Sequence, residues 1–290
     1  MGLAKDIALG LLIVFILLPL AIIILTLVGV GVPHAHPVPN PVEVNYTAAG
    51  LLYMGPPTKA LAGYYCVYQV QVASDGWLGN CNTTGYVSLP NGVTAPIREC
   101  TFNPSQQAYS PPGYSIQLNA QLSNGLWLQN VWGSAWSSNG SILLENAVLK
   151  NGELQYWAGP PAEPCGWLVI VISNGIAYFG YSSDGVNVDW YASYPVGNAT
   201  ITNFLMNTGL VIGGPGSGAG VDFNKLYVVF SLWYWNGTAW APAPVTPTLT
   251  TNTAEFVTHA WTYVSGNNGV VSWPEPVNST ISTPRPGFTP

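Results

Sequence analysis

The feature that most constrains the fold is a series of Asn-Gly and Asp-Gly dipeptides spaced along the chain. They begin at Asp75, Asn91, Asn124, Asn139, Asn151, Asn174, Asp184, Asn236 and Asn268. Such dipeptides suit the type I′ turn, because both of its central residues need positive φ. The runs beside them are β-branched and aromatic, as in Trp167 to Ile172 and Leu226 to Trp235. Apolar runs joined by tight turns predict an all-β domain, an antiparallel β-sandwich of jelly-roll-like type.

The amino-terminal residues predict a single transmembrane helix in front of that domain. From Ile7 to Val32 the chain carries no charged side chain. A helix needs about 20 apolar residues to cross a bilayer, whereas a cleaved signal peptide has an apolar region of about 7–15 residues. We therefore predict an anchor at residues 7–32, although the small residues near Val30 to Ala35 leave cleavage open. Lys5 favours a cytoplasmic flank at residues 1–6, which places the rest of the chain outside the cell.

The remaining chain divides by composition into three parts. A Pro-rich stretch at residues 33–42 predicts an extended stalk. Residues 43–272 form a continuous body, which we predict to be the extracellular β-domain. The Pro/Ser/Thr-rich residues 273–290 form a tail that is either disordered or packed on neighbouring elements.

The chain is unusually poor in charge. Asp, Glu, Lys and Arg make up 6% of its residues, against about 25% in a typical soluble domain. A surface of amides and hydroxyls barely changes its charge with pH, whereas carboxylates lose interactions as they become protonated. This composition suits an acidic environment, and it also suits a sheet protein covered by partners. With 6 Lys and Arg residues scattered along the chain, nucleic-acid binding is excluded as a function.

The cysteines and sequons fit an exterior location. The cysteines are Cys66, Cys81, Cys100 and Cys165. An even number in an oxidising compartment predicts two disulfides, with three pairings open. Their spacing matches no zinc motif, so we predict no metal. Asn-x-Ser/Thr sequons, which are compatible with N-glycans, occur at Asn45, Asn82, Asn139, Asn198, Asn236 and Asn278.

Several familiar catalytic motifs are absent. The glycine-rich segment from Gly213 to Gly220 is not followed by the Lys-Ser/Thr of a phosphate-binding loop, so it predicts a turning connection between strands. The chain has no Gly-x-Ser-x-Gly elbow, and His259 is the single histidine of the body. We therefore predict no cofactor. The chemistry that remains is carboxyl-based activation of water.

Several segments between Ser115 and Glu255 carry a resemblance to a known family. In order, they are Ser115-Ile-Gln-Leu-Asn119, Trp127-Leu-Gln-Asn-Val131, Ala177-Tyr-Phe-Gly-Tyr181, Leu210-Val-Ile-Gly-Gly-Pro-Gly216, Leu232-Trp-Tyr-Trp-Asn-Gly-Thr238 and Thr253-Ala-Glu255. Taken together, these segments resemble the thermopsin family of archaeal acid proteases. The resemblance implies a secreted or surface endopeptidase that cleaves polypeptides at low pH and high temperature. The chain departs from the family pattern at two places. It has Glu145-Asn-Ala-Val148 where the family has an Asp before an Asn-x-Trp-Asn run, and it has Asn207-Thr-Gly209 where acidic residues usually precede the glycine-rich segment.

The candidate catalytic residues are three acids and one amide. They are Gln129, Glu145, Asp189 and Glu255. Acid proteolysis needs one group that takes a proton from water and another that polarises the amide carbonyl. A carboxyl pair can do this, as can a carboxyl assisted by a Gln amide. Aromatic neighbours are expected to shield Asp189.

Two other functions compete with the peptidase. A catalytically inactive relative would serve as a surface-layer, adhesion or filament component, and the missing acidic positions, the stalk and the sequons favour it. Such a protein would self-associate through strand edges or aromatic patches. Carbohydrate binding by exposed Trp and Tyr side chains is the third possibility.

Overall fold

The computed structural model describes residues 40–88, 94–104, 108, 110–133, 143–150, 153–203, 208–248 and 255–290. Val38–Pro290 forms one compact unit. The predicted flank, the predicted anchor at residues 7–32 and most of the stalk lie outside the described residues. Across the ranges that are described, no helix has the length and apolar character needed to span a membrane.

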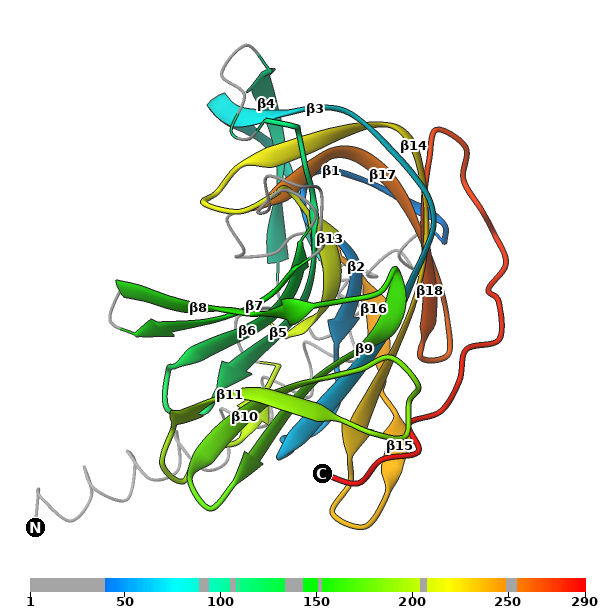
Figure 1. The fold of residues 1–290 in the computed structure, drawn as a ribbon. Helices are drawn as coiled ribbons and strands as arrows, with labels where there is room; N and C mark the ends of the chain where they lie inside the picture. Colours follow the sequence, from blue (N-terminus) through cyan, green and yellow to red (C-terminus); the bar gives the residue numbers. More distant parts are fainter. Residues whose placement is uncertain are drawn as a thin grey trace, which may run out of the picture. The chain divides into compact units, whose positions relative to one another are not determined.

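The strands form two sheets (Figure 1). Sheet A has the order β1 (Val42–Thr47), β17 (Phe256–Ser265), β18 (Asn268–Trp273), β14 (Gly220–Trp235), β3 (Ala60–Ser88), β9 (Cys165–Ser173), β10 (Ile176–Ser182) and β11 (Asp189–Pro195), with β15 (Trp240–Pro242) beside β14 and β4 (Thr94–Asn103) beside β3. Sheet B has the order β16 (Val245–Pro247), β2 (Ala49–Tyr53), β13 (Gly209–Gly213), β5 (Ser115–Leu122), β6 (Trp127–Gly133), β7 (Leu143–Lys150) and β8 (Glu153–Pro161), with β12 (Ile201–Thr202) beside β5.

The all-β, antiparallel prediction is confirmed. Apart from a short parallel contact of Gly220 and Val221 with Phe256 and Val257, the strands described pair antiparallel. Strands β5 to β8 form one meander and β9 to β11 another. This strand order does not show the jelly-roll-like arrangement that was expected.

The two sheets share one apolar core. Along β5, Ile116, Leu118, Ala120 and Leu122 are buried in it together with residues of sheet A such as Leu61 and Phe230. The sheets approach closely at Gly63 of β3, where an added Cβ would lie 2.9 Å from Leu210 of β13. Because side chains alternate along a strand, the even-numbered positions of β5 face this core and the odd-numbered positions face away from it.

Two of the predicted turns are confirmed, those at Asn124 and Asn174, whereas the predicted turn at Asn268 lies inside β18 (Asn268–Trp273). Asn124 and Gly125 connect β5 to β6, and Asn174 and Gly175 connect β9 to β10. Asn174 has φ 51° and Gly175 has φ 77°. These two positive values are what the type I′ turn requires.

The predicted turn at Asp75 is wrong. Asp75 and Gly76 lie inside the long strand β3, and Asp75 is fully buried. Its carboxylate accepts hydrogen bonds from the backbone N–H of Ala108 at 2.9 Å and of Gly113 at 3.2 Å. An added Cβ on Gly76 would lie 2.4 Å from the carbonyl oxygen of Asn103. The glycine therefore permits the close approach of β4, and the aspartate anchors the segment that follows β4.

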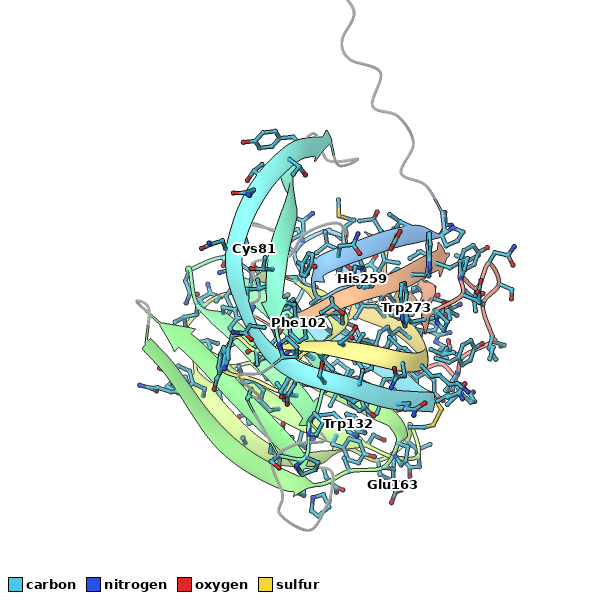
Figure 2. The ribbon with its side chains drawn as sticks, turned by 90° about the horizontal axis from the view of Figure 1, so that it is seen from above. Cys81, Phe102, Trp132, Glu163, His259 and Trp273 are labelled. Atoms are coloured by element: carbon cyan, nitrogen blue, oxygen red, sulfur yellow. A yellow bond between two sulfur atoms is a disulfide. The ribbon has the colours of Figure 1, made fainter. Side chains whose placement is uncertain are left out.

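Two disulfides are present, as predicted. Cys66 pairs with Cys165 and links β3 to β9. Cys81 pairs with Cys100 across the hairpin of β3 and β4, the arm on which Figure 2 labels Cys81. The structure thus selects one of the three pairings.

Residues 273–290 pack on neighbouring strands. Phe288 is buried, and its ring makes edge contacts with Trp167 and Trp240. The Trp240 indole N–H donates to the carbonyl of Phe288 at 2.7 Å, and Arg285 donates to the carbonyl of Trp240 at 2.8 Å. Of the two alternatives for the tail, the structure shows the packed one.

Candidate functional site

The side of sheet B that faces away from the core carries a row of buried polar side chains. Ser115, Gln117 and Asn119 occupy the odd-numbered positions of β5, and Gln129 of β6 lies directly across from Asn119. Their exposed fractions are 0%, 2%, 2% and 7%. Burial of polar groups is costly unless they are hydrogen-bonded. We call these four residues the polar cluster.

The polar cluster is a directed chain of hydrogen bonds. Gln129 Nε2 donates to Gln117 Oε1 at 2.8 Å. Gln117 Nε2 donates to Ser115 Oγ at 2.8 Å, and Ser115 Oγ donates to the carbonyl of Gly214 at 2.7 Å. Asn119 Nδ2 donates to Gln117 Oε1 at 3.4 Å, whereas Asn119 Oδ1 is buried without a hydrogen-bond partner. A buried acceptor of this kind is costly in a folded protein and calls for a functional explanation.

The glycine-rich segment brings Glu255 to the same face of sheet B. Gly213 lies directly across from Ser115, and a Cβ added to Gly213 would lie 3.1 Å from the Cβ of Glu255. The backbone N–H of Gly218 donates to Glu255 Oε1 at 3.2 Å. Glu255 is partly exposed. The carboxyl therefore stands where the polar cluster meets the glycine-rich segment.

The glycines are needed for this close packing. An added Cβ on Gly214 would lie 1.9 Å from the carbonyl oxygen of Ala219, and one on Gly220 would lie 2.0 Å from the ring of Phe256. A larger residue at position 214 would clash within the segment itself, and one at position 220 would push the segment away from Phe256. The segment is a turning connection, as predicted, and its tightness holds Glu255 against sheet B.

The structure places two of the predicted site residues, Gln129 and Glu255, at the polar cluster and places Asp189 away from it. Gln129 belongs to the polar cluster, and Glu255 lies at its end. The backbone of Glu145 is inside β7, across from Val131, which in turn is across from Gln117. Asp189 is in β11 at the end of sheet A and is exposed, so the expected shielding by aromatic side chains is not found. The catalytic roles of these residues stay predictions.

Sequence reasoning missed Ser115, Gln117 and Asn119 as site residues. The signal was present in the strand itself, where polar side chains alternate with Ile116 and Leu118. Alternation of apolar and polar residues usually indicates a strand that is buried on its apolar face and exposed to solvent on its polar face. What the pattern did not reveal was that the amide face is buried too.

Asn130, the residue after Gln129, points to the opposite face and joins the two sheets. Asn130 Nδ2 donates to the carbonyls of Val169 at 3.0 Å and Gly180 at 2.9 Å. The hydroxyl of Tyr191 donates to Asn130 Oδ1 at 2.7 Å. Asn130 thus ties β6 to β9 and β10 through buried hydrogen bonds and to β11 through a partly buried one.

Buried tyrosines surround the backbone of Glu163, on the side of the molecule that Figure 2 marks with Trp132 and Glu163. Tyr65 donates its hydroxyl to the carbonyl of Glu163 at 2.9 Å, and Trp132 donates its indole N–H to the same carbonyl at 3.0 Å. The N–H of Glu163 donates to Tyr181 at 2.9 Å. Burial raises the pKa of Tyr65 and of Tyr181 above that of free tyrosine.

These pKa shifts predict that alkali destabilises the fold. The folded chain holds the tyrosine protons more tightly than the unfolded chain, so their contribution is complete below about pH 10 and is lost as pH rises above it. The pKa of Asp184 is shifted in the opposite direction, below that of a free aspartate. Backbone N–H groups of Asn187 and Val186 lower its pKa, so its contribution is lost only as pH falls below about 4. Melting temperatures measured from about pH 2 to 11 should therefore decline above pH 10. An unchanged melting temperature through pH 11 would contradict this reading.

Comparison with known proteins supports a protease family. Residues 168–260 match the family model described as Thermopsin. This range runs from β9 into β17 and contains the glycine-rich segment and Glu255, whereas β5 and β6 precede it. No curated protein matches the chain. The match confirms the resemblance found in the sequence and supports a thermopsin-like protease at the level of the family. The family model matches residues 168–260, about a third of the chain, and this partial match supports a divergent thermopsin family member.

Proposed function

We propose that the chain is a membrane-anchored extracellular acid endopeptidase, in which the Glu255 carboxyl acts together with the polar cluster. One observation carries this proposal. The hydrogen-bond chain from Gln129 through Gln117 and Ser115 ends on the glycine-rich segment that holds Glu255. Gly213 and Gln117 are diagonal neighbours on adjacent strands, which places such positions roughly 7–8 Å apart.

The chemistry follows from the groups present. The Glu255 carboxylate takes a proton from water, and the water oxygen bonds to the carbonyl carbon of the peptide. The carbonyl oxygen becomes an oxyanion, which accepts a hydrogen bond from the second N–H of a Gln side-chain amide. The C–N bond then breaks, and the proton held by Glu255 passes to the leaving amine. Since Glu255 is partly exposed and the amides behind it are buried, substrate would enter from the Glu255 side.

The extracellular location rests on independent features. The uncharged run at residues 7–32 has the length of a transmembrane helix. The two disulfides are typical of oxidising compartments. The sequon residues Asn82, Asn198 and Asn278 are exposed, as glycan attachment requires.

The test is cleavage of a denatured protein by the full chain in detergent, from about pH 2 to 7 at elevated temperature. An endopeptidase of this type should show an optimum well below neutral and produce internal fragments. A folded chain that cleaves nothing at any pH, and that assembles in solution, would instead be the inactive surface relative. Light scattering on the same samples separates these two results.

A further inference from the structure

A cavity of about 460 Å³ lies at the end of β14 that is remote from Glu255. It is lined by Pro56, Pro57, Thr58, Lys59, Thr200, Tyr234, Trp235, Asn236 and Gly237. Strand β14 is 16 residues long, with its first residue beside Phe256 and its last residue at the cavity. The volume falls within the range of about 300–1,000 Å³ that is usual for small-molecule sites. The cavity therefore has a size suited to a small ligand, and it is separate from Glu255 and the polar cluster.

The apolar wall of the cavity is held in place. The ring of Tyr234 packs against Tyr53, with 6.0 Å between centroids. The Tyr53 hydroxyl donates to the carbonyl of Pro56 at 2.6 Å, and the Thr58 hydroxyl donates to the carbonyl of Trp235 at 2.7 Å. These bonds connect the prolines on one side to the aromatic residues on the other. A ligand would meet an aromatic surface that is already formed.

The polar groups at the cavity retain donor capacity. The Lys59 ammonium donates to the carbonyl of Ala199 at 2.5 Å and approaches Asn198 Oδ1 at 3.5 Å. An ammonium has three protons, so one is left for a ligand. Asn236 Oδ1 accepts from the backbone N–H of Ala239 at 2.9 Å, which leaves its Nδ2 to donate. In the part of the chain that the structure describes, no carboxylate contacts Lys59.

We propose that this cavity binds a short saccharide that carries a carboxylate, such as a uronic acid. A sugar ring presents apolar C–H faces that pack on Tyr234 and Trp235, and hydroxyls that accept from Asn236 and Thr200. Aromatic side chains with polar groups at their edges suit such amphipathic ligands. The carboxylate balances Lys59, because a charge-assisted hydrogen bond is stronger than a neutral one. The single cation makes a phosphate-rich ligand a poor fit.

Calorimetry on the full chain in detergent at about pH 6 tests the proposal. The probes are a glucuronate-containing disaccharide, cellobiose as its neutral counterpart, and acetate as an acid without a sugar. The acidic disaccharide should bind saturably, cellobiose about tenfold more weakly because it lacks the charged hydrogen bond, and acetate not measurably. Lys59→Met should remove the preference for the acidic sugar while cellobiose binding stays unchanged. Trp235→Ala should remove binding of both sugars.

Trp190→Ala is the matched control, since Trp190 is 43% exposed on β11 away from the cavity. It should leave all binding intact. Absence of saturable sugar binding, or equal binding by the Lys59→Met and unmodified chains, would overturn the proposal. So would binding of a Pro-rich peptide in place of the sugars. Because the readout is heat of binding and Glu255 lies elsewhere, the result is independent of whether the chain cleaves peptides.

Discussion

Glu255→Gln should lower kcat/KM for acid proteolysis by about 10²–10⁴-fold, the contribution of a general acid–base group. The glutamine keeps an oxygen that can accept the Gly218 N–H bond, so the fold should be retained. What is lost is the ability to take a proton from water and return it to the amine. Initial rates on a denatured protein, measured at the pH optimum of the unmodified chain, give the ratio directly.

Asp189→Asn is the control for that experiment. Asp189 is an exposed acid on β11 of sheet A, outside the polar cluster. Its replacement should leave the rate within about twofold, which is little beside the loss expected at a general base. If Glu255→Gln kept full activity while Asp189→Asn lost it, the centre would lie at β11 and the assignment to Glu255 and the polar cluster would be refuted. Melting temperatures of both variants exclude unfolding as the cause.

Asn130→Ala should cost about 3–4 kcal/mol of unfolding free energy. It removes two buried hydrogen bonds and one partly buried hydrogen bond between the sheets, each worth about 1 kcal/mol, and leaves the carbonyls of Val169 and Gly180 without this donor. Urea unfolding followed by tryptophan fluorescence measures the change as a shift of the midpoint at constant slope.

Tyr191→Phe is the matched variant for Asn130→Ala, because it tests one of the three hydrogen bonds alone. It removes one of the three hydrogen bonds and keeps the ring, so a loss of about 1 kcal/mol is expected. Equal losses in Asn130→Ala and Tyr191→Phe would mean that the two backbone carbonyl contacts add nothing. The role of Asn130 as the link between the sheets would then be wrong.

Local sequence patterns predicted the antiparallel strands and the turns at Asn124 and Asn174, because these features depend on neighbouring residues. Asn174 and Gly175 form a turn because Asn and Gly adopt the positive φ values that the turn requires. The prediction failed at Asp75, where contacts from Ala108 and Gly113, distant in sequence, decide the outcome. Turn chemistry is a local preference, and a buried hydrogen-bonded carboxylate overrides it.

The site was only partly predictable for the same reason. Gln129 and Glu255 were named from the sequence, but their common face depends on the register of β5, β6 and β13. Asp189 was named beside them because of its aromatic neighbours, and it lies on β11 of sheet A, outside the polar cluster. Gln117, the acceptor for both Gln129 and Asn119, was not singled out, because its partners become neighbours only when the strands pair.

The alternation along β5 exposes one strand to two separate pressures over evolutionary time. Ile116 and Leu118 are constrained by packing in the core, where one aliphatic side chain can replace another at modest cost in stability. Ser115 and Gln117 are constrained by a hydrogen-bond chain in which each side chain needs its donor and its acceptor. Relatives that keep the chemistry should vary freely at the first pair and hardly at all at the second. Relatives that have become purely structural should drift at both.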